Sequence, residues 1–164
     1  MNELVGFENE DYQKVGSLNH SIAQARLTGL LSNDDRFTSA VELSLDISQI
    51  DVSQFGIKAK DELKPDVCCY PNNVGFKSDD ILKMSDMPLL AIEILSPKQT
   101  IDEILAKFKA YFALGVKSCW LVMPTVKSIA VYLQFENFKT FGTNDSEVVD
   151  EALDIRLPLQ KIFR

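Results

Sequence analysis

The segment PLLAIEILSP, residues 88–97, constrains the fold more than any other part of the sequence. From Leu89 to Leu95 every residue is apolar except Glu93. Such a run is typical of a central strand that is covered on both faces of its sheet. A buried ionised carboxylate costs several kcal/mol unless it is paired or bound to a metal. Glu93 therefore needs a partner or has a function.

A strong helical pattern follows this strand. Thr100 and Glu103 form a capping box, and Gly115 stands where a C-terminal cap belongs. Strands are expected next at residues 118–123 and 128–134. A helix between two strands is the usual crossover of a parallel pair. The expected buried stripe of the helix consists of Ile101, Ile104, Leu105, Phe108 and Phe112.

The first half of the chain predicts one helix and two strands. Alternating apolar residues predict a half-buried strand at 41–47, and a short strand lies between prolines at 65–71. Residues 11–31 have a helical period whose apolar face is formed by Val15, Leu18, Ile22 and Ala25. His20 lies off that face and is expected to be exposed or hydrogen-bonded. Together with a tail that packs its leucines on the core, these elements predict a mixed α/β fold, a mixed β-sheet flanked by helices.

Length and composition favour one ordinary globular domain over residues 1–164. The chain is 46% hydrophobic and 25% charged. No segment approaches the roughly 20 apolar residues of a membrane helix, and the acidic start has no apolar signal region. We therefore expect a cytoplasmic protein that does not enter a membrane. The three cysteines lack C-x-x-C spacing, so they are expected to be buried, reduced thiols, and Trp120 is expected in the core.

The net charge of −7 is unusual for a protein that binds nucleic acid. Such proteins usually carry a basic footprint. A local basic patch or bound metal ions can offset an unfavourable total. The charge therefore argues against a nucleic-acid binder without excluding one.

Three residues are candidates for chemistry. Asp66 follows Pro65 at the start of one strand, Glu93 lies in the next strand, and Lys107 lies at the edge of the apolar stripe of the following helix. From that edge the lysine stem can run along the core while its ammonium reaches the end of the sheet. Two carboxylates that hold Mg²⁺ or Mn²⁺, with a lysine to neutralise developing charge, suit phosphodiester hydrolysis.

At these positions the chain resembles the PD-(D/E)XK nuclease superfamily. The stretches KPDV, PLLAIEILSP, KFKAYFALGVKSCWLV and SIAVYL resemble more closely the bacterial putative restriction endonuclease family, formerly a domain of unknown function, over roughly residues 12–163. The resemblance implies a restriction-endonuclease-like core and a metal-dependent endonuclease that cleaves DNA. By motif matching, Asp66 and Glu93 would bind Mg²⁺ or Mn²⁺ together with the backbone carbonyl of Ile94. A homodimer would suit this class, because two strands need two cuts.

The sequence departs from the superfamily pattern at Leu95. The common pattern places a lysine there, two residues after the acid. In the closer family a lysine on the following helix is thought to take over, and Lys107 occupies that place. The resemblance therefore assigns Lys107 a catalytic role beside Asp66 and Glu93.

Several alternatives remain open from the residues alone. Glu93 could pair with Lys107 without any metal, or Lys107 could pair with Glu103 one helical turn away, for a few tenths of a kcal/mol. Asp66 by itself could be a polar residue at a strand start. The protein could then be a non-catalytic binding or interaction protein that retains the nuclease fold. A hydrolase of a small phosphorylated compound is a third possibility, which would need a deep closed pocket.

Overall fold

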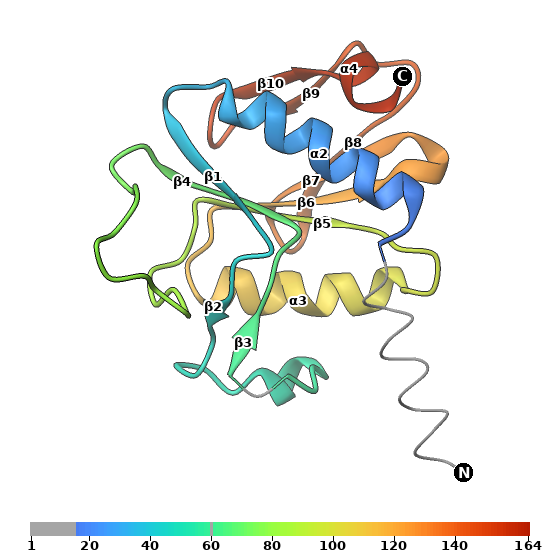
Figure 1. Cartoon of the computed structure of the whole chain (residues 1–164). Helices are drawn as coiled ribbons and strands as arrows, with labels where there is room; N and C mark the ends of the chain where they lie inside the picture. The colour runs from blue at the N-terminus through green and yellow to red at the C-terminus, as the bar shows by residue number, and fades with distance from the viewer. Residues whose placement is uncertain (1–15, 60) are drawn as a thin grey trace.

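A six-stranded mixed sheet forms the centre of the molecule (Figure 1). The computed structural model describes residues 16–59 and 61–164. The sheet order is β1-β4-β5-β6-β7-β8, and only β5 and β6 pair in parallel. The strands of this sheet are β1 (Phe37–Val41), β4 (Val67–Pro71), β5 (Leu90–Ile94), β6 (Ser118–Met123), β7 (Ser128–Gln134) and β8 (Asn137–Phe141).

Helices and two small sheets cover the central sheet. Figure 1 shows α2 on one face of the sheet and α3 on the other. The helical segments are α2 (Leu18–Ser32), η1 (Val52–Phe55), α3 (Ile101–Ala113), η2 (Pro124–Val126) and α4 (Leu159–Phe163). The small sheets pair β2 (Leu45–Asp46) with β3 (Glu62–Leu63), and β9 (Glu147–Asp150) with β10 (Ile155–Pro158). This arrangement confirms the predicted fold class.

The expected central strand is β5, and all five of its residues are buried. Because side chains alternate across a strand, Ile92 and Ile94 belong to the core cluster on the α2 side, whereas Ala91 belongs to the cluster on the α3 side. Glu93 has the same parity as Ala91. The carboxylate therefore lies on the α3 face of the sheet, next to the helix that carries Lys107.

Helix α3 forms the crossover between the parallel strands. The Thr100 hydroxyl accepts a hydrogen bond from the Glu103 N–H at 3.2 Å, and Gly115 adopts a positive φ of 101° just beyond the helix. The Thr100 half of the predicted capping box and the predicted C-terminal glycine cap are thereby confirmed. Of the expected stripe, Ile104 and Phe108 are buried, but Ile101 is exposed. Besides these two, the residues of α3 that are buried are Ala110 and Tyr111.

Helix α2 buries a different face from the one we expected. The prediction was wrong for Leu18, which is 74% exposed, and also for Ile22 and Ala25, both of which are exposed. Residues 11–15 of the expected helix lie outside the described residues. The buried residues are Ala23, Leu27 and Leu31, each four positions after the last. This change of helical phase brings His20 to the side of the helix that faces the sheet.

The strand expected at 41–47 is interrupted. Glu42 has a positive φ of 50°, which ends β1 at Val41, and pairing resumes only in β2. Leu45 and Ile47 are buried as predicted, whereas Val41 is exposed. The alternation of the sequence was therefore correct for the second half of this segment only.

The cysteines and the chain end agree with the expectations. Cys68, Cys69 and Cys119 are buried and not bonded to one another. Burial raises the pKa of the Cys68 and Cys69 thiols to about 12, so both remain protonated. The tail packs Leu157 and Leu159 against the core, and Trp120 is fully buried. Within the described residues, no helix is long and apolar enough to cross a membrane.

Candidate functional site

Asp66 and Glu93 face each other across two neighbouring strands. In the antiparallel pair of β4 and β5, Val67 lies opposite Ile92. One further step in this register places Asp66, the residue before β4, opposite Glu93, and the two carboxylates are close enough to interact. The fold therefore brings together the two carboxylates that the sequence predicted to act together.

Glu93 lies against helix α3 and is only 2% exposed. The Tyr111 hydroxyl donates a hydrogen bond of 2.9 Å to its Oε1. The Lys107 Nζ lies 3.7 Å from the same oxygen, and the lysine side chain is 28% exposed. Tyr111 and Lys107 are one helical turn apart, so one face of α3 supplies both contacts.

Burial raises the pKa of the Glu93 carboxyl to about 7, because a buried site disfavours its charged form. The Lys107 ammonium opposes this effect. The nearby Asp66 carboxylate adds to it, since two close negative charges repel each other. Desolvation thus outweighs the ion pair with Lys107. Such a raised pKa beside a second carboxylate is typical of functional sites.

Asp66 is held by contacts from two parts of the fold. Its Oδ2 accepts a hydrogen bond of 2.7 Å from the Ile94 backbone N–H. Its Oδ1 lies 3.1 Å from Nε2 of His20, which reaches it from helix α2. The Gln24 side chain donates to the Asp66 backbone carbonyl at 2.9 Å. The contact with Asp66 raises the pKa of His20, although burial of the ring opposes that shift.

The backbone of Ile94 faces Asp66 because of the strand register. Extending the pairing of β4 and β5 places Ile94 opposite Pro65, and the N–H and C=O of a residue point to the same side of an antiparallel pair. The Ile94 N–H is bonded to the Asp66 side chain. Pro65 has no N–H to donate to the Ile94 carbonyl. This carbonyl, which the sequence resemblance assigned to a metal, therefore faces the side of the strand on which Asp66 lies.

The comparison with known families agrees with this arrangement. Residues 8–160 match the Uma2 family, described as "Putative restriction endonuclease". The chain belongs to this family. The match supports nuclease function for the protein and confirms the resemblance that the sequence suggested. No curated protein matches the sequence significantly.

A solved structure shares the fold of this Uma2 family member. It is a crystal structure from Anabaena variabilis described as a putative nuclease, and it superposes with a TM-score of 0.72. The two chains are 17% identical, and the match covers 90% of this chain and 81% of the other. At that identity the likeness is evidence for a common nuclease-like fold alone.

The donor set of the Uma2 site fits a hard divalent cation through few protein ligands. Within residues 16–59 and 61–164, no group of three or more His, Cys, Asp and Glu side chains is arranged to hold a metal ion. Mg²⁺ usually keeps several waters and binds one or two carboxylates together with substrate phosphates. Asp66 and Glu93 could supply such carboxylates, and a bound cation would relieve the mutual repulsion that helps to raise the Glu93 pKa.

Leu95 and Lys107 lie on the same side of the sheet. Leu95 has the same parity as Glu93 and packs among the apolar side chains on the α3 side of the sheet. A lysine at that strand position would point to the same face as Glu93, and Lys107 reaches that face from the helix instead. Among the described ion pairs, Lys107 contacts Glu93, and no pair joins it to Glu103.

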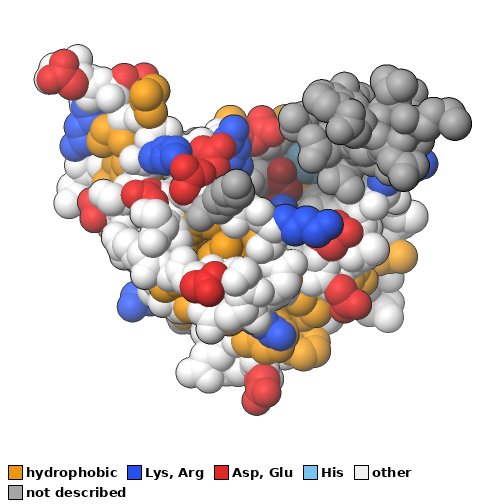
Figure 2. Space-filling model, turned by 90° about the horizontal axis from the view of Figure 1, so that it is seen from below, with side chains coloured by type: hydrophobic (Ala, Val, Ile, Leu, Met, Phe, Trp, Pro, Cys, Tyr) orange, Lys and Arg blue, Asp and Glu red, His pale blue; other side chains and the backbone are white. Residues whose placement is uncertain are grey.

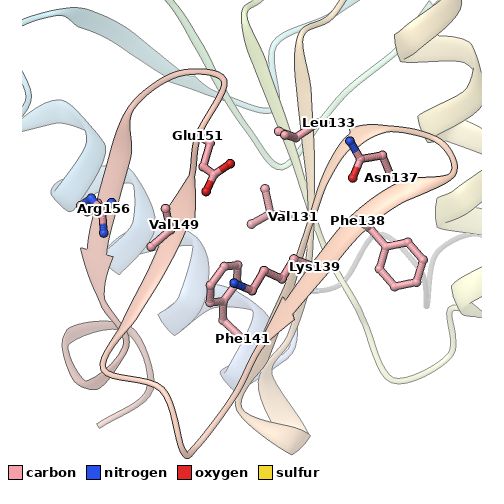
Figure 3. Close-up of a pocket in the computed structure, with 9 residues that line it drawn as sticks. All are labelled: Val131, Leu133, Asn137, Phe138, Lys139, Phe141, Val149, Glu151 and Arg156. Atoms are coloured by element: carbon pink, nitrogen blue, oxygen red, sulfur yellow. The ribbon is translucent and has the colours of Figure 1, made fainter.

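A groove lies elsewhere on the described part of the molecule. It has a volume of about 340 Å³ and lies between β7 and β8 on one side and β9 and β10 on the other (Figure 3). Apolar side chains such as Val131 and Val149 line it, and Lys139 lies over the Phe141 ring. None of the site residues borders this groove. It therefore gives no support to the hypothesis of a small phosphorylated substrate at the carboxylate pair.

The surface on the α3 side carries charges of both signs. Figure 2 shows acidic and basic side chains interspersed over the described part of this face. A nucleic acid would therefore approach a mixed surface, where short-range contacts and bound cations would have to offset the net charge of −7.

Proposed function

We propose that the protein is a metal-dependent endonuclease that hydrolyses phosphodiester bonds in DNA. The observation that carries this proposal is the closeness of the Asp66 and Glu93 carboxylates, with the Lys107 Nζ 3.7 Å from Glu93 Oε1. Membership of the Uma2 family gives the class of reaction, and the two carboxylates give the place where it would occur.

In this proposal the two carboxylates and the Ile94 carbonyl bind Mg²⁺ or Mn²⁺. A bound divalent ion polarises a phosphoryl oxygen and lowers the pKa of a bound water. Asp66 is oriented for this role by the Ile94 N–H, and Glu93 is oriented by the Tyr111 hydroxyl. The wall of apolar side chains around Glu93 excludes water, which strengthens its electrostatic interactions.

Lys107 would neutralise the negative charge that develops on the phosphate. Its side chain is 28% exposed and extends from α3 to the buried carboxylate. A phosphate oxygen beside the metal could thus meet the ammonium without a rearrangement of the helix. Stabilisation of this kind by one positioned group is commonly worth a factor of about 10² to 10³ in rate.

The test is cleavage of supercoiled plasmid and of single-stranded DNA with Mg²⁺ or Mn²⁺. Wild type should cleave at least one of these substrates, and Asp66→Ala and Glu93→Ala should lose that activity. Asp79→Ala is a matched control, because Asp79 is an exposed aspartate. Lys107→Met should reduce cleavage while Mn²⁺ binding is retained.

Two outcomes of this test would contradict the proposal. One is the absence of metal-dependent cleavage across several substrates. The other is cleavage that persists equally in Asp66→Ala and Glu93→Ala, which would indicate a contaminating nuclease or a different site.

One observation favours a second candidate, a non-catalytic binding protein with the same fold. Glu93 already has two partners, Tyr111 and Lys107, in an arrangement that requires no metal. This candidate predicts weak Mn²⁺ binding and a Glu93→Gln variant at least as stable as wild type. Calorimetric titration that finds a tight Mn²⁺ site in wild type and none in Glu93→Gln would exclude it.

The homodimer, the cytoplasmic location and the single domain over residues 1–164 stay predictions. Sedimentation of the purified protein with and without DNA would test the first of them. A dimer that forms only on DNA would favour coordinated cleavage of two strands.

A further inference from the structure

His20 is the only histidine in the sequence, and it approaches the site from outside the sheet. Its side chain is 12% exposed, and its Nε2 lies 3.1 Å from Oδ1 of Asp66, whose side chain is 15% exposed. The other carboxylate oxygen of Asp66 is bonded to the Ile94 N–H at 2.7 Å. Each oxygen of this carboxylate is therefore in contact with one nitrogen of the protein.

We propose that His20 is a positioning residue that fixes the Asp66 carboxylate in the orientation needed to bind the metal. This inference rests on the proposed function, because it deepens the same site. A carboxylate has about four lone-pair sites, so one contact to each oxygen leaves the remaining lone pairs available. Hydrogen-bonded partners of metal-binding side chains commonly fix their orientation in this way.

The geometry favours positioning over direct metal binding by His20. The Nε2 nitrogen is directed at Asp66 Oδ1, the atom that it would have to leave in order to bind an ion. The described residues also contain no group of three or more His, Cys, Asp and Glu side chains arranged around a common metal position. His20 therefore lies behind Asp66, as a support for it.

The contact is not needed merely to attach helix α2. Gln24, one turn further along the same helix, donates a hydrogen bond of 2.9 Å to the Asp66 backbone carbonyl. The helix also buries Ala23, Leu27 and Leu31. Gln24 thus anchors the helix to the same residue through the backbone, while His20 contacts only its carboxylate. Gln24 therefore serves to attach helix α2, whereas His20 serves to orient the Asp66 carboxylate.

The experiment is calorimetric titration of Mn²⁺ into the intact protein at one fixed pH, without DNA. His20→Ala should weaken Mn²⁺ binding by about 10- to 100-fold, the usual effect of removing such a partner. His20→Gln should restore most of the affinity, because the glutamine amide can place an N–H near Oδ1. Asn19→Ala, at an exposed position on the same helix, is the control and should leave the affinity within about threefold, well below that loss.

A second measurement needs neither metal nor activity. The Ile94 amide donates to Asp66 Oδ2, so its NMR signal reports the orientation of the carboxylate. In metal-free protein, His20→Ala should shift the Ile94 amide resonance and increase its hydrogen exchange, whereas Gln24→Ala should affect it less. His20→Gln should return the signal towards its wild-type position.

The outcomes separate this inference from the proposed function. If wild type binds no Mn²⁺, both are overturned. If wild type binds Mn²⁺ and Asp66→Ala does not, but His20→Ala binds as tightly as wild type, the positioning role alone is wrong. Tighter binding by His20→Ala would also overturn it, because His20 would then act only as a positive charge that opposes the cation. Equal loss in His20→Gln and His20→Ala would show that the imidazole itself is required, contrary to the proposal.

Discussion

Two buried carboxylates in neighbouring parts of this fold have very different surroundings. Asp150, at the end of β9, is completely buried and accepts hydrogen bonds from the Trp120 indole at 2.9 Å and from the Leu153 N–H at 3.1 Å. Glu93, in β5, is equally inaccessible but faces another acid, Asp66. Burial alone therefore does not identify a functional carboxylate in this protein.

The difference lies in what satisfies each charge. Two N–H donors hold Asp150 and tie the turn between β9 and β10 to the central sheet. Buried polar groups of this kind stabilise one arrangement of the core. Glu93 has a tyrosine hydroxyl and a lysine at 3.7 Å, while the second carboxylate raises its pKa. This arrangement stores an unfavourable interaction that a bound cation would relieve.

The comparison predicts that isosteric amide substitutions of the two acids have very unequal effects on activity. Glu93→Gln should reduce metal-dependent cleavage by a factor on the order of 10³, because metal ligation is worth several kcal/mol in the transition state. Asp150→Asn should leave cleavage per folded molecule within about twofold, since Asp150 contacts Trp120 and lies outside the carboxylate pair. Initial cleavage rates, normalised to the folded fraction from circular dichroism, give the measurement.

An equal loss of activity in Glu93→Gln and Asp150→Asn would contradict the assignment of different roles to the two acids. It would mean that rigidity of the sheet, which both acids support, limits the reaction. A double variant would then show whether the two effects are additive, as expected for sites without shared partners.

The order of the two effects should be reversed for stability, with Asp150→Asn the more damaging substitution. Asp150→Asn replaces one acceptor oxygen by an amide group and leaves a buried N–H without a partner, so the free energy of unfolding should fall by about 3 kcal/mol. Glu93→Gln should be as stable as wild type or more so at pH 8. Urea unfolding followed by Trp120 fluorescence measures both differences, and a stable Asp150→Asn protein would show that water replaces the lost contact.

The Glu93 half of this comparison could be predicted from the sequence, because the signals for it are local. Glu93 was identifiable because it interrupts an apolar run, and the Thr100 cap located helix α3 with its Lys107. Asp66 was identifiable through its motif with Pro65. These signals depend on residues close together in the chain, which is why the β5–α3–β6 unit could be inferred.

The role of His20 could not be inferred in the same way. Apolar residues occur on more than one side of α2, and the periodicity placed Leu18 and Ile22 inside. Packing on the sheet instead buries Ala23 and Leu27, which turns His20 towards Asp66. Only tertiary contacts determine which of these two faces of α2 is buried. The Trp120–Asp150 bond was missed for a similar reason, since it joins residues 30 positions apart.

The raised pKa of Glu93 predicts that the stability of the wild-type protein depends on pH. A carboxyl whose pKa rises from 4.5 to about 7 on folding is favoured in its protonated form, so wild type loses stability as the pH increases through that window. The loss relative to Glu93→Gln should approach about 3 kcal/mol by pH 8. Urea unfolding at several pH values in EDTA provides the test.

The relevant quantity is the difference in the free energy of unfolding between wild type and Glu93→Gln. The pKa of His20 is also raised, so its contribution is present below its unfolded value and is lost at higher pH, but the residue is common to both proteins. Addition of Mn²⁺ should reduce the loss in wild type and have no effect in Glu93→Gln. If the difference in stability between wild type and Glu93→Gln stays constant from pH 4.5 to 8, water reaches Glu93 and its carboxylate is adequately solvated.

The smallest predicted effect concerns the hydrogen bond from Tyr111 to Glu93. Tyr111→Phe removes a donor to the carboxylate without changing the volume of the side chain appreciably. Hydrogen bonds to charged groups contribute about 1.5–3 kcal/mol, and Glu93 is mostly ionised at pH 8 but protonated at pH 5. The variant should therefore be about 1.5 kcal/mol less stable at pH 8 and nearly unchanged at pH 5, and the Glu93 pKa should rise further.

Phe108→Leu, on the same face of α3 without a hydrogen bond, is the control, since its effect should not depend on pH. If Tyr111→Phe loses the same stability at pH 5 and pH 8, Tyr111 contributes through packing and not through its hydrogen bond. Lys107 would then be the contact that distinguishes the surroundings of Glu93 from those of Asp150.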